Sequence, residues 1–336
     1  MNVKNKIMII GGHGKVGQSI TRALKDLNLI LVGRNEEKMR NFLTKENIQA
    51  QTRTMNIDSI DFTALQDVFC VIVCVDQDST TLVQYCDKHE INYMDVTANS
   101  EYIEKIQQLP LSGNSNILLG VGLAPGLTNL LAEKFVQMHP SAKDIEIQLI
   151  LGLGEKHGDA ALKWTLDNFI KDYRHKALGK LRPFTKKSSV MIHGKRLQTY
   201  NFNFVDQHML NRAYPDKCFT TYLGFDQSLV TSLIYGLKKI GFLQLLRVKN
   251  IYGIIEMFFR NPKIGTDVFI ASILSQGHVL CAMGQDEGRF SGLIAGEVAK
   301  RFVSMDLKGG LLGIADVIGL EEVVENERFG LETLSV

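Results

Sequence analysis

The chain has 336 residues, 45% of them hydrophobic and 22% charged, which is the composition of a globular protein with one or two domains. A formal net charge of +2 gives no reason to expect nucleic acid or an acidic membrane surface as a partner. Five cysteines without a CxxC pair are typical of free thiols in a reducing compartment. No signal-peptide pattern is present and no apolar run reaches the ~18 residues of a membrane span, so we expect a cytoplasmic protein.

The first predicted elements are a strand and a helix joined by a glycine-rich loop. Residues 7–10 are an apolar run typical of a strand buried on both faces, and apolar residues recur at helical spacing from residue 16 to residue 27. Between them, Gly12, Gly14 and Gly17 form G-x-G-x-x-G, which permits a tight turn, close approach of a pyrophosphate and close packing of the helix. This pattern predicts dinucleotide binding, with a plain turn as the alternative. The loop residues expected to contact the cofactor are Gly12, His13, Gly14, Lys15, Val16 and Gly17.

The end of the second predicted strand indicates which dinucleotide is bound. Residues 29–32 are apolar and lead into Gly33-Arg34-Asn35, where an NAD site usually has Asp or Glu to bind the ribose hydroxyls. The first acid, Glu36, comes only at the start of the next helix. A guanidinium can clamp a 2′-phosphate and stack on adenine, so Arg34 and Asn35 are predicted to contact NADP, in preference to NAD. The alternative is a solvated arginine in a turn.

Strands and helices alternate through the rest of this region, which predicts a doubly wound parallel sheet. Ligands of such sheets lie beyond the carboxyl ends of the strands. We therefore expect Cys74 and Val75, after one strand, and Thr97, after the next, to contact the cofactor. The expected strands are residues 50–55, 68–75, 92–96 and 116–121, and the expected helices are residues 35–45, 80–89 and 101–107.

From about residue 144 the pattern changes to that of a second domain. Alternating residues 145–151 and a turn at residues 193–195 favour an antiparallel sheet with helices on one side. The apolar stretch 228–259 is interpreted as core helices, with a dimer interface or a lid as alternatives. Helices near the C-terminus are expected to return to the first domain. The predicted domains are residues 1–122, residues 123–290 and a C-terminal segment 291–336.

Two motifs resemble the saccharopine dehydrogenase-like oxidoreductases. Residues 93–97, YMDVT, are similar to that family's Y-x-D-x-[ST], and residues 122–132, GLAPGLTNLLA, to its G-x-x-P-G-[LIM]-[ST]-x-L-x-A signature. The resemblance implies an NAD(P)-dependent oxidoreductase, often a homodimer, with an N-terminal Rossmann domain, an inserted α+β substrate domain and C-terminal helices returning to the first domain. Saccharopine-forming members tend to have Asp before the Pro-Gly pair, where this chain has Ala124.

The candidate catalytic and substrate-binding residues come from several stretches of the chain. His157 titrates near neutrality and is a candidate proton donor, and Asp95 is a candidate catalytic carboxylate; the alternatives are a solvated histidine and a structural carboxylate. Pro125 and Gly126 form a turn, after which Thr128 is expected to cap a helix whose N–H groups face a carboxylate or phosphate; the alternative is a hinge with an ordinary helix cap. Arg212 is a candidate carboxylate clamp. Pro125, Gly126, Thr128 and Arg212 are thus the predicted substrate residues, and no metal site is expected.

The resulting hypothesis is an NADP(H)-dependent oxidoreductase that transfers a hydride to an imine or carbonyl of a small, carboxylate-bearing amino- or keto-acid. One alternative is a nucleotide-sensing or partner-binding module on the same fold. The other is an enoyl or carbonyl reductase for an apolar substrate.

Overall fold

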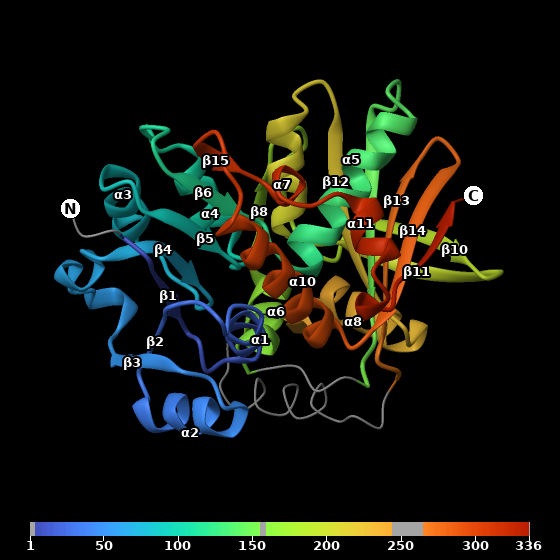
Figure 1. Ribbon diagram of the computed structural model, residues 1–336. Helices are drawn as coiled ribbons and strands as arrows, with labels where there is room; N and C mark the ends of the chain where they lie inside the picture. The colour runs from blue at the N-terminus through green and yellow to red at the C-terminus, as the bar shows by residue number, and fades with distance from the viewer. Residues whose placement is uncertain (1–3, 155–158, 244–264, 336) are drawn as a thin grey trace. The chain divides into compact units, whose positions relative to one another are not determined.

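The computed structural model of the protein describes residues 4–154, 159–243 and 265–335, and the chain divides into two compact units (Figure 1). The first unit contains Met1–Gly126 and Gly288–Val323, and the second contains Leu127–Glu287 and Val324–Val336. The last segment, 324–336, differs from our expectation that the whole C-terminal region joins the first domain. Its strand β16 (Glu332–Ser335) pairs with β14 (His278–Gln285) and so belongs to the second unit.

The first unit is built on a parallel sheet whose described strands run in the order β15-β6-β5-β4-β1-β2-β3 (Figure 1). The order 3-2-1-4-5-6 within it is that of a Rossmann sheet, so the predicted fold class is confirmed. The central strands are apolar and buried on both faces, as their sequences predict. The strands are β1 (Lys6–Ile10), β2 (Leu29–Gly33), β3 (Ala50–Thr54), β4 (Val68–Val73), β5 (Asn92–Asp95), β6 (Asn116–Leu119) and β15 (Gly310–Leu312).

The helices of the first unit connect successive strands, and one of them comes from far along the chain. Its helix α10 packs on α1: a Cβ atom at Gly292 would lie 2.5 Å from Oγ of Ser19, so the two helices approach where side chains are smallest. This contact and the β15–β6 pairing show how the chain returns to its first unit. The helices are α1 (Lys15–Ala23), α2 (Glu36–Glu46), α3 (Thr81–Lys88), α4 (Ser100–Gln107) and α10 (Glu287–Phe302); α11 (Leu320–Glu325) crosses the unit boundary.

The second unit contains a mixed sheet, not the antiparallel one expected. Its strand order is β10-β11-β12-β7-β13-β14-β16, and β12 pairs with β7 in parallel along its whole length. The chain between these two strands contains two helices, which gives it the length that a parallel crossover needs. The strands are β7 (Asp144–Leu151), β10 (Lys187–Ile192), β11 (Lys195–Asn201), β12 (Cys218–Phe225), β13 (Val268–Ser275), β14 and β16, with a separate pair β8 (Tyr173–His175) and β9 (Gly179–Leu181).

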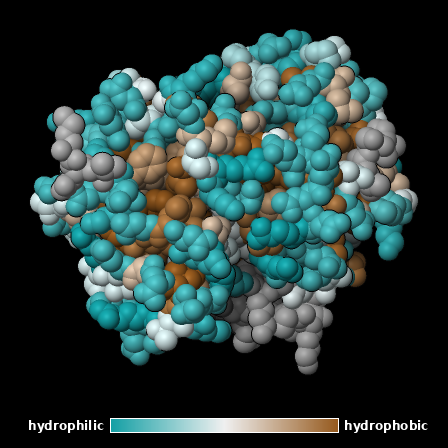
Figure 2. Space-filling model, viewed as in Figure 1, coloured by the Kyte–Doolittle hydropathy of each residue, from teal (hydrophilic) through white to brown (hydrophobic). Residues whose placement is uncertain are grey.

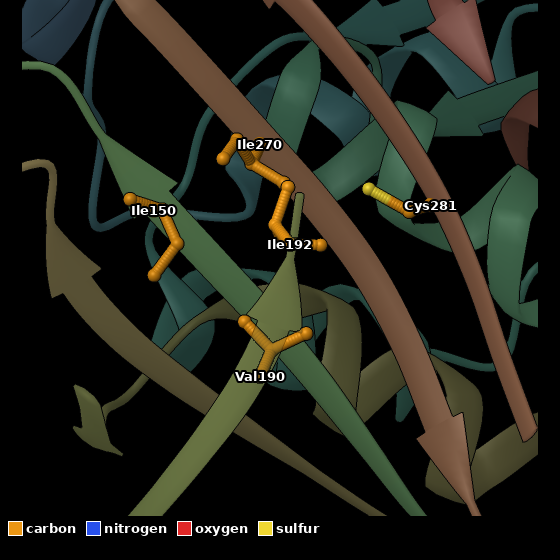
Figure 3. Packing of buried hydrophobic residues seen from close by; sticks show 5 residues of the cluster. All are labelled: Ile150, Val190, Ile192, Ile270 and Cys281. Atoms are coloured by element: carbon orange, nitrogen blue, oxygen red, sulfur yellow. The ribbon is translucent and has the colours of Figure 1, made fainter. Parts of the chain in front are cut away.

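The core of the second unit shows that this sheet is strongly curved. Ile150 of β7, Val190 and Ile192 of β10, Ile270 of β13 and Cys281 of β14 form one buried cluster (Figure 3). Because β10 lies three places from β7 in the strand order, the β10–β11 hairpin must bend over the sheet to reach it. The helices of this unit are α5 (Thr128–Met138), α6 (Asp159–Ile170), α7 (Val205–Ala213) and α8 (Ser228–Lys239).

The surface is mainly hydrophilic on the face seen in Figure 2, with hydrophobic residues visible in patches. Helix α8 exposes Leu229 and Leu233, at 87% and 58%, so this part of the stretch 228–259 is only partly core. Residues 244–264 lie outside the described part of the chain. Among the described residues, no helix combines the length and apolar character needed to span a membrane.

Candidate functional site

The glycine loop lies between β1 and α1, at the carboxyl edge of the parallel sheet. Gly11 has φ +82°, and a Cβ atom at Gly12 would lie 2.8 Å from Cγ of Leu31 in β2. A Cβ atom at Gly17 would overlap the carbonyl oxygen of Gly11 and lie 2.7 Å from Cα of Gly12. At Gly14, by contrast, the closest atom would be 3.4 Å away. The fold therefore needs glycine at positions 12 and 17, whereas the space beside Gly14 is open, as a site for a pyrophosphate requires.

The start of α1 is suited to an anion. Gly14 is its N-cap, no side chain caps the helix, and no acidic residue stands in its first turn. The positive end of the helix dipole is therefore not neutralised by a carboxylate of this helix. Gln18 donates a hydrogen bond from Nε2 to the carbonyl oxygen of His13, 2.9 Å away, which holds the loop against the helix. Lys15 is exposed at the first helical position.

The residues predicted after β4 lie beside this loop. The amide of Cys74 donates to the carbonyl of Ile10 at 2.8 Å, and a Cβ atom at Gly11 would lie 2.6 Å from Cγ1 of Val75. Burial, and then the charge of Asp95, raise the pKa of the Cys74 thiol. The thiol is thus neutral, which disfavours a role for Cys74 as a nucleophile.

Arg34 follows β2 directly and is exposed. It borders an open hollow of about 690 Å³ next to the carboxyl ends of β2 and β3. Its lining also includes a second guanidinium, that of Arg53, and one carboxylate, that of Asp61. Hydrogen bonds from Thr63 are the main reason that the pKa of Asp61 lies below its usual range. The hollow is lined by Arg34, Arg53, Thr54, Met55, Asn56, Ser59, Asp61 and Ala64.

The first acid after β2 is already engaged. Oε1 of Glu36 accepts hydrogen bonds from Arg40, at 2.6 and 3.0 Å, and from Thr52 at 3.2 Å, and the bond from Arg40 is the main reason that the pKa of Glu36 lies below its usual value. It is therefore not placed as the ribose-binding acid of an NAD site. Asn35 is the N-cap of α2, because its Oδ1 accepts from the amide of Lys38 at 2.9 Å. We assign Asn35 this capping role, beside its predicted contact with the cofactor.

His13 lies against the end of β2. A Cβ atom at Gly33 would be 2.8 Å from Nδ1 and 2.9 Å from Cε1 of the imidazole, so only glycine leaves room for the ring. Nδ1 is buried and has no hydrogen-bond partner in the part of the chain that the structure describes. Burial, then the positive charges of Lys38 and Arg34, lower the pKa of His13.

Asp95, at the end of β5, is fully buried within a polar cluster. Its Oδ2 accepts hydrogen bonds from Tyr93, at 2.5 Å, and from Gln77, at 2.8 Å, and its Oδ1 accepts from the amide of Thr97 at 2.8 Å. The hydroxyl of Tyr102 lies 3.0 Å from that of Tyr93. Burial raises the pKa of Asp95 to about 6, although these hydrogen bonds act in the opposite direction.

This geometry favours the structural alternative for Asp95 over direct catalysis. A carboxylate with 0% exposure and donors on both oxygens cannot touch a substrate, so its action on chemistry must pass through the residues that it holds. Thr97 is one of these: its amide is fixed by Asp95, and its hydroxyl donates to Asp76 at 3.1 Å. We refer to Asp95, Gln77, Tyr93, Thr97 and Tyr102 as the Asp95 cluster.

The expected turn at Pro125–Gly126 is present, but Thr128 does not cap the helix after it. The Ala124–Pro125 peptide bond is cis, and Gly126 has φ +139°, a conformation that favours glycine. Leu127 is the N-cap of α5, and no side-chain cap bond is made. Thr128 is fully buried inside the helix, next to the buried carboxylate of Asp206, whose pKa is raised by burial. The cap prediction is wrong because the hydroxyl points into the core.

Two further predicted residues, Arg212 and His157, come from a later part of the chain. Arg212 is exposed in the last turn of α7, in the second unit. His157 lies outside the described residues. Both therefore stay predictions from the sequence.

Comparison with known proteins identifies the first unit. Residues 7–115 match the family described as "Saccharopine dehydrogenase NADP binding domain". The match covers the N-terminal part of the chain. The resemblance inferred from the motifs is thereby confirmed, and the family supports the choice of NADP that Arg34 predicted.

One solved structure is similar in fold over nearly the whole chain. Apo saccharopine dehydrogenase (L-Glu forming) from Saccharomyces cerevisiae matches with a TM-score of 0.63 and 14% identity, covering 99% of this chain and 100% of that one. At this identity the match shows the fold alone. The WlbA (WbpB) dehydrogenase from Thermus thermophilus, in complex with NAD and UDP-GlcNAcA, has a TM-score of 0.42 and 11% identity over 91% of this chain and 97% of that one. No curated protein matches by sequence.

Sequence reasoning missed several residues of the NADP-binding domain. Gln77 and Tyr102 complete the Asp95 cluster, and Lys38 and Arg53 add positive charge near Arg34. Arg53 stands near the end of β3, so the strand-end rule could have included it. Gln77 follows β4, but its contact with Asp95 is visible only in the structure. Tyr102 and Lys38 lie on helices, where only the three-dimensional structure shows that they face the site.

Proposed function

We propose that the protein is an NADP(H)-dependent oxidoreductase that transfers a hydride to an imine or carbonyl of a small amino- or keto-acid. The observation that carries the proposal is the combination of an open, glycine-lined helix start with Arg34 in the position that an acid occupies in NAD sites. Reduced NADP, when bound, supplies the hydride. The residues of the chain would bind and orient the cofactor and the substrate and supply the proton.

The diphosphate would lie at the start of α1. The open side of Gly14 leaves space for it, and the helix dipole together with Lys15 favours its charge. The adenosine end would lie near the hollow beside Arg34 and Arg53, where a guanidinium can grip the 2′-phosphate and stack on the base. Cys74, Val75 and Thr97 would line the path of the cofactor across the sheet edge.

The Asp95 cluster would act as a positioning group. By fixing the amide of Thr97, Asp95 holds the backbone that follows β5 in one conformation. His157 is the proposed proton donor for the reduced nitrogen or oxygen, on the basis of its neutral-range pKa in model peptides. Arg212 is proposed to bind a carboxylate. The turn Pro125–Gly126 and Thr128 after it are each proposed as substrate-binding residues.

The proposal also includes a homodimer in the cytoplasm. The dimer is supported by the exposed leucines of α8, because apolar side chains gathered on one helix are frequent at subunit contacts. Light scattering of the purified chain measures the mass directly, and a monomer at all concentrations would remove this part of the proposal without affecting the cofactor.

Turnover tests the enzymatic part. Loss of NADPH absorbance is followed with single amino acids, single keto acids and pairs of both, with Gly14→Ala as the matched control that blocks the diphosphate. We expect oxidation with at least one pair in the wild type only. Tight NADPH binding without turnover for any pair would instead support a nucleotide-sensing module, which the complete burial of Asp95 also favours.

A further inference from the structure

His13 has a position in the cofactor site that packing alone does not explain. Its ring lies so close to Gly33 that a larger residue at the strand end would displace it, and its Nδ1 is buried without a partner among the described residues. A buried polar atom without a hydrogen bond is costly, so a native protein keeps one mainly where another molecule completes it. The residue after Gly33 is Arg34, the proposed ligand of the 2′-phosphate.

The charges around the ring are all positive. Lys38, from the first turn of α2, and Arg34, after β2, are the charged groups that act on the imidazole, and both oppose its protonation. The nearby acid, Glu36, is bound to Arg40 and does not offset them. We call His13, Arg34 and Lys38 the β2 basic group. Without a ligand this group holds two cations next to a histidine that is kept neutral.

We propose that the β2 basic group is a proton-linked binding site for the 2′-phosphate of NADPH, in which His13 becomes the third cation when the phosphate is bound. This inference rests on the proposed cofactor and adds the residue that makes its recognition depend on pH. A phosphate carries up to two negative charges and several acceptor oxygens, so its arrival reverses the electrostatic field at the ring. The proton is taken from solvent, and the imidazolium N–H then has an acceptor in the phosphate.

The linkage predicts a pH dependence for NADPH that NADH does not share. NADPH should bind more tightly as the pH falls from about 8.5 to about 6, as His13 gains its proton in the complex. NADH lacks the phosphate, so its affinity should not depend on His13. The phosphate itself has a second pKa of about 6 and loses a proton on binding cations, which is the reverse direction and is common to all variants.

Calorimetric titration of the full chain with NADPH, in two buffers of different ionisation enthalpy, counts the protons exchanged. At about pH 7 we expect the wild type to take up more protons on binding NADPH than His13→Gln does. At pH 6 the wild type should bind NADPH about tenfold more tightly than His13→Gln, and near pH 8.5 the two affinities should be equal. His193→Gln, in the turn between β10 and β11, is the matched control and should behave as the wild type.

A second measurement removes dependence on the variant's folding. In wild-type protein with isotope-labelled histidine, 2′,5′-ADP should raise the pKa of one imidazole, and 5′-AMP should not. Equal proton uptake and equal pH profiles for wild type and His13→Gln, with both binding NADPH, would overturn the inference alone. Failure of every form to bind NADPH would overturn the proposed cofactor and this inference together.

Discussion

The β2 basic group and the Asp95 cluster lie at the same edge of one parallel sheet and differ in how their polar groups are satisfied. In the Asp95 cluster, both carboxylate oxygens accept hydrogen bonds from side chains or backbone of the protein itself. In the β2 basic group, Nδ1 of His13 is buried without a described partner, and one of the two cations, Arg34, lines an open hollow. A closed network stabilises a fold, whereas an unfinished one needs a ligand. We therefore place recognition at β2 and support at β5.

The largest expected effect comes from substitutions of the glycines between β1 and α1. In Gly17→Ala, the new methyl group overlaps the backbone of Gly11, so the loop or α1 must move, with an expected loss of about 1–3 kcal/mol in the free energy of unfolding and loss of NADPH binding. In Gly14→Ala the methyl group meets nothing closer than 3.4 Å, so we expect unchanged stability but lost binding. Denaturant unfolding and fluorescence titration measure the two quantities; equal stability of both variants would contradict the packing described.

The next largest effect is expected from removing the proposed contact with the 2′-phosphate. Arg34→Ala should raise the dissociation constant for NADPH about 10- to 100-fold, since it removes a charge-assisted contact, and leave that for NADH nearly unchanged. Arg53→Ala, which also changes the lining of the hollow, is the comparison and should have the smaller effect, because the charge of Arg53 also acts on Asp61. Parallel losses for both nucleotides in Arg34→Ala would mean that the guanidinium binds a part common to both.

The pH dependence of stability tests the role of Asp95 in its cluster. Burial raises the pKa of Asp95 to about 6 in the folded protein, above its ordinary value of 3.8, so its contribution to stability is complete below the unfolded value and is lost as the pH rises through about 6. Relative to Asp95→Asn, which does not titrate, the wild type should lose about 3 kcal/mol between pH 4 and pH 7. Urea unfolding of both proteins across this range gives the difference, and a constant difference would show that Asp95 titrates normally.

The smallest effect is expected at Asn35, where it distinguishes helix capping from contact with the cofactor. Asn35→Ala removes the hydrogen bond to the amide of Lys38 and should cost about 1 kcal/mol of stability. NADPH affinity should change less than twofold if capping is the main role of Asn35. Asn35→Asp, which keeps a capping oxygen, is the matched control. A tenfold loss of affinity in Asn35→Ala at full stability would restore its predicted role at the cofactor.

Much of the first unit could be predicted from sequence because its signals are local. Apolar runs identify β1, β2 and β4, and the glycines between β1 and α1 carry the backbone requirement within seven residues. The second unit was harder, since the parallel pairing of β7 with β12 depends on contacts between strands far apart in the chain. Thr128 failed as a cap because the hydroxyl's direction is set by packing against Asp206, which no local pattern contains.

The same reasoning explains the candidate site. Arg34 could be identified because its position after a strand is defined by sequence alone. The burial of Asp95 could not, because it depends on Gln77 and Tyr102 arriving from two other segments. The space for His13 likewise depends on Gly33, twenty residues further along the chain. Residue spacing identifies the strand ends. Only the three-dimensional structure shows at which of them the polar groups are hydrogen-bonded within the protein.

The most direct test of the central claim is a calorimetric titration of the purified wild-type chain with NADPH and, separately, with NADH under the same conditions. The account predicts one NADPH bound per chain, with NADH at least about tenfold weaker. No binding of either nucleotide, or equal affinity for both, would contradict it.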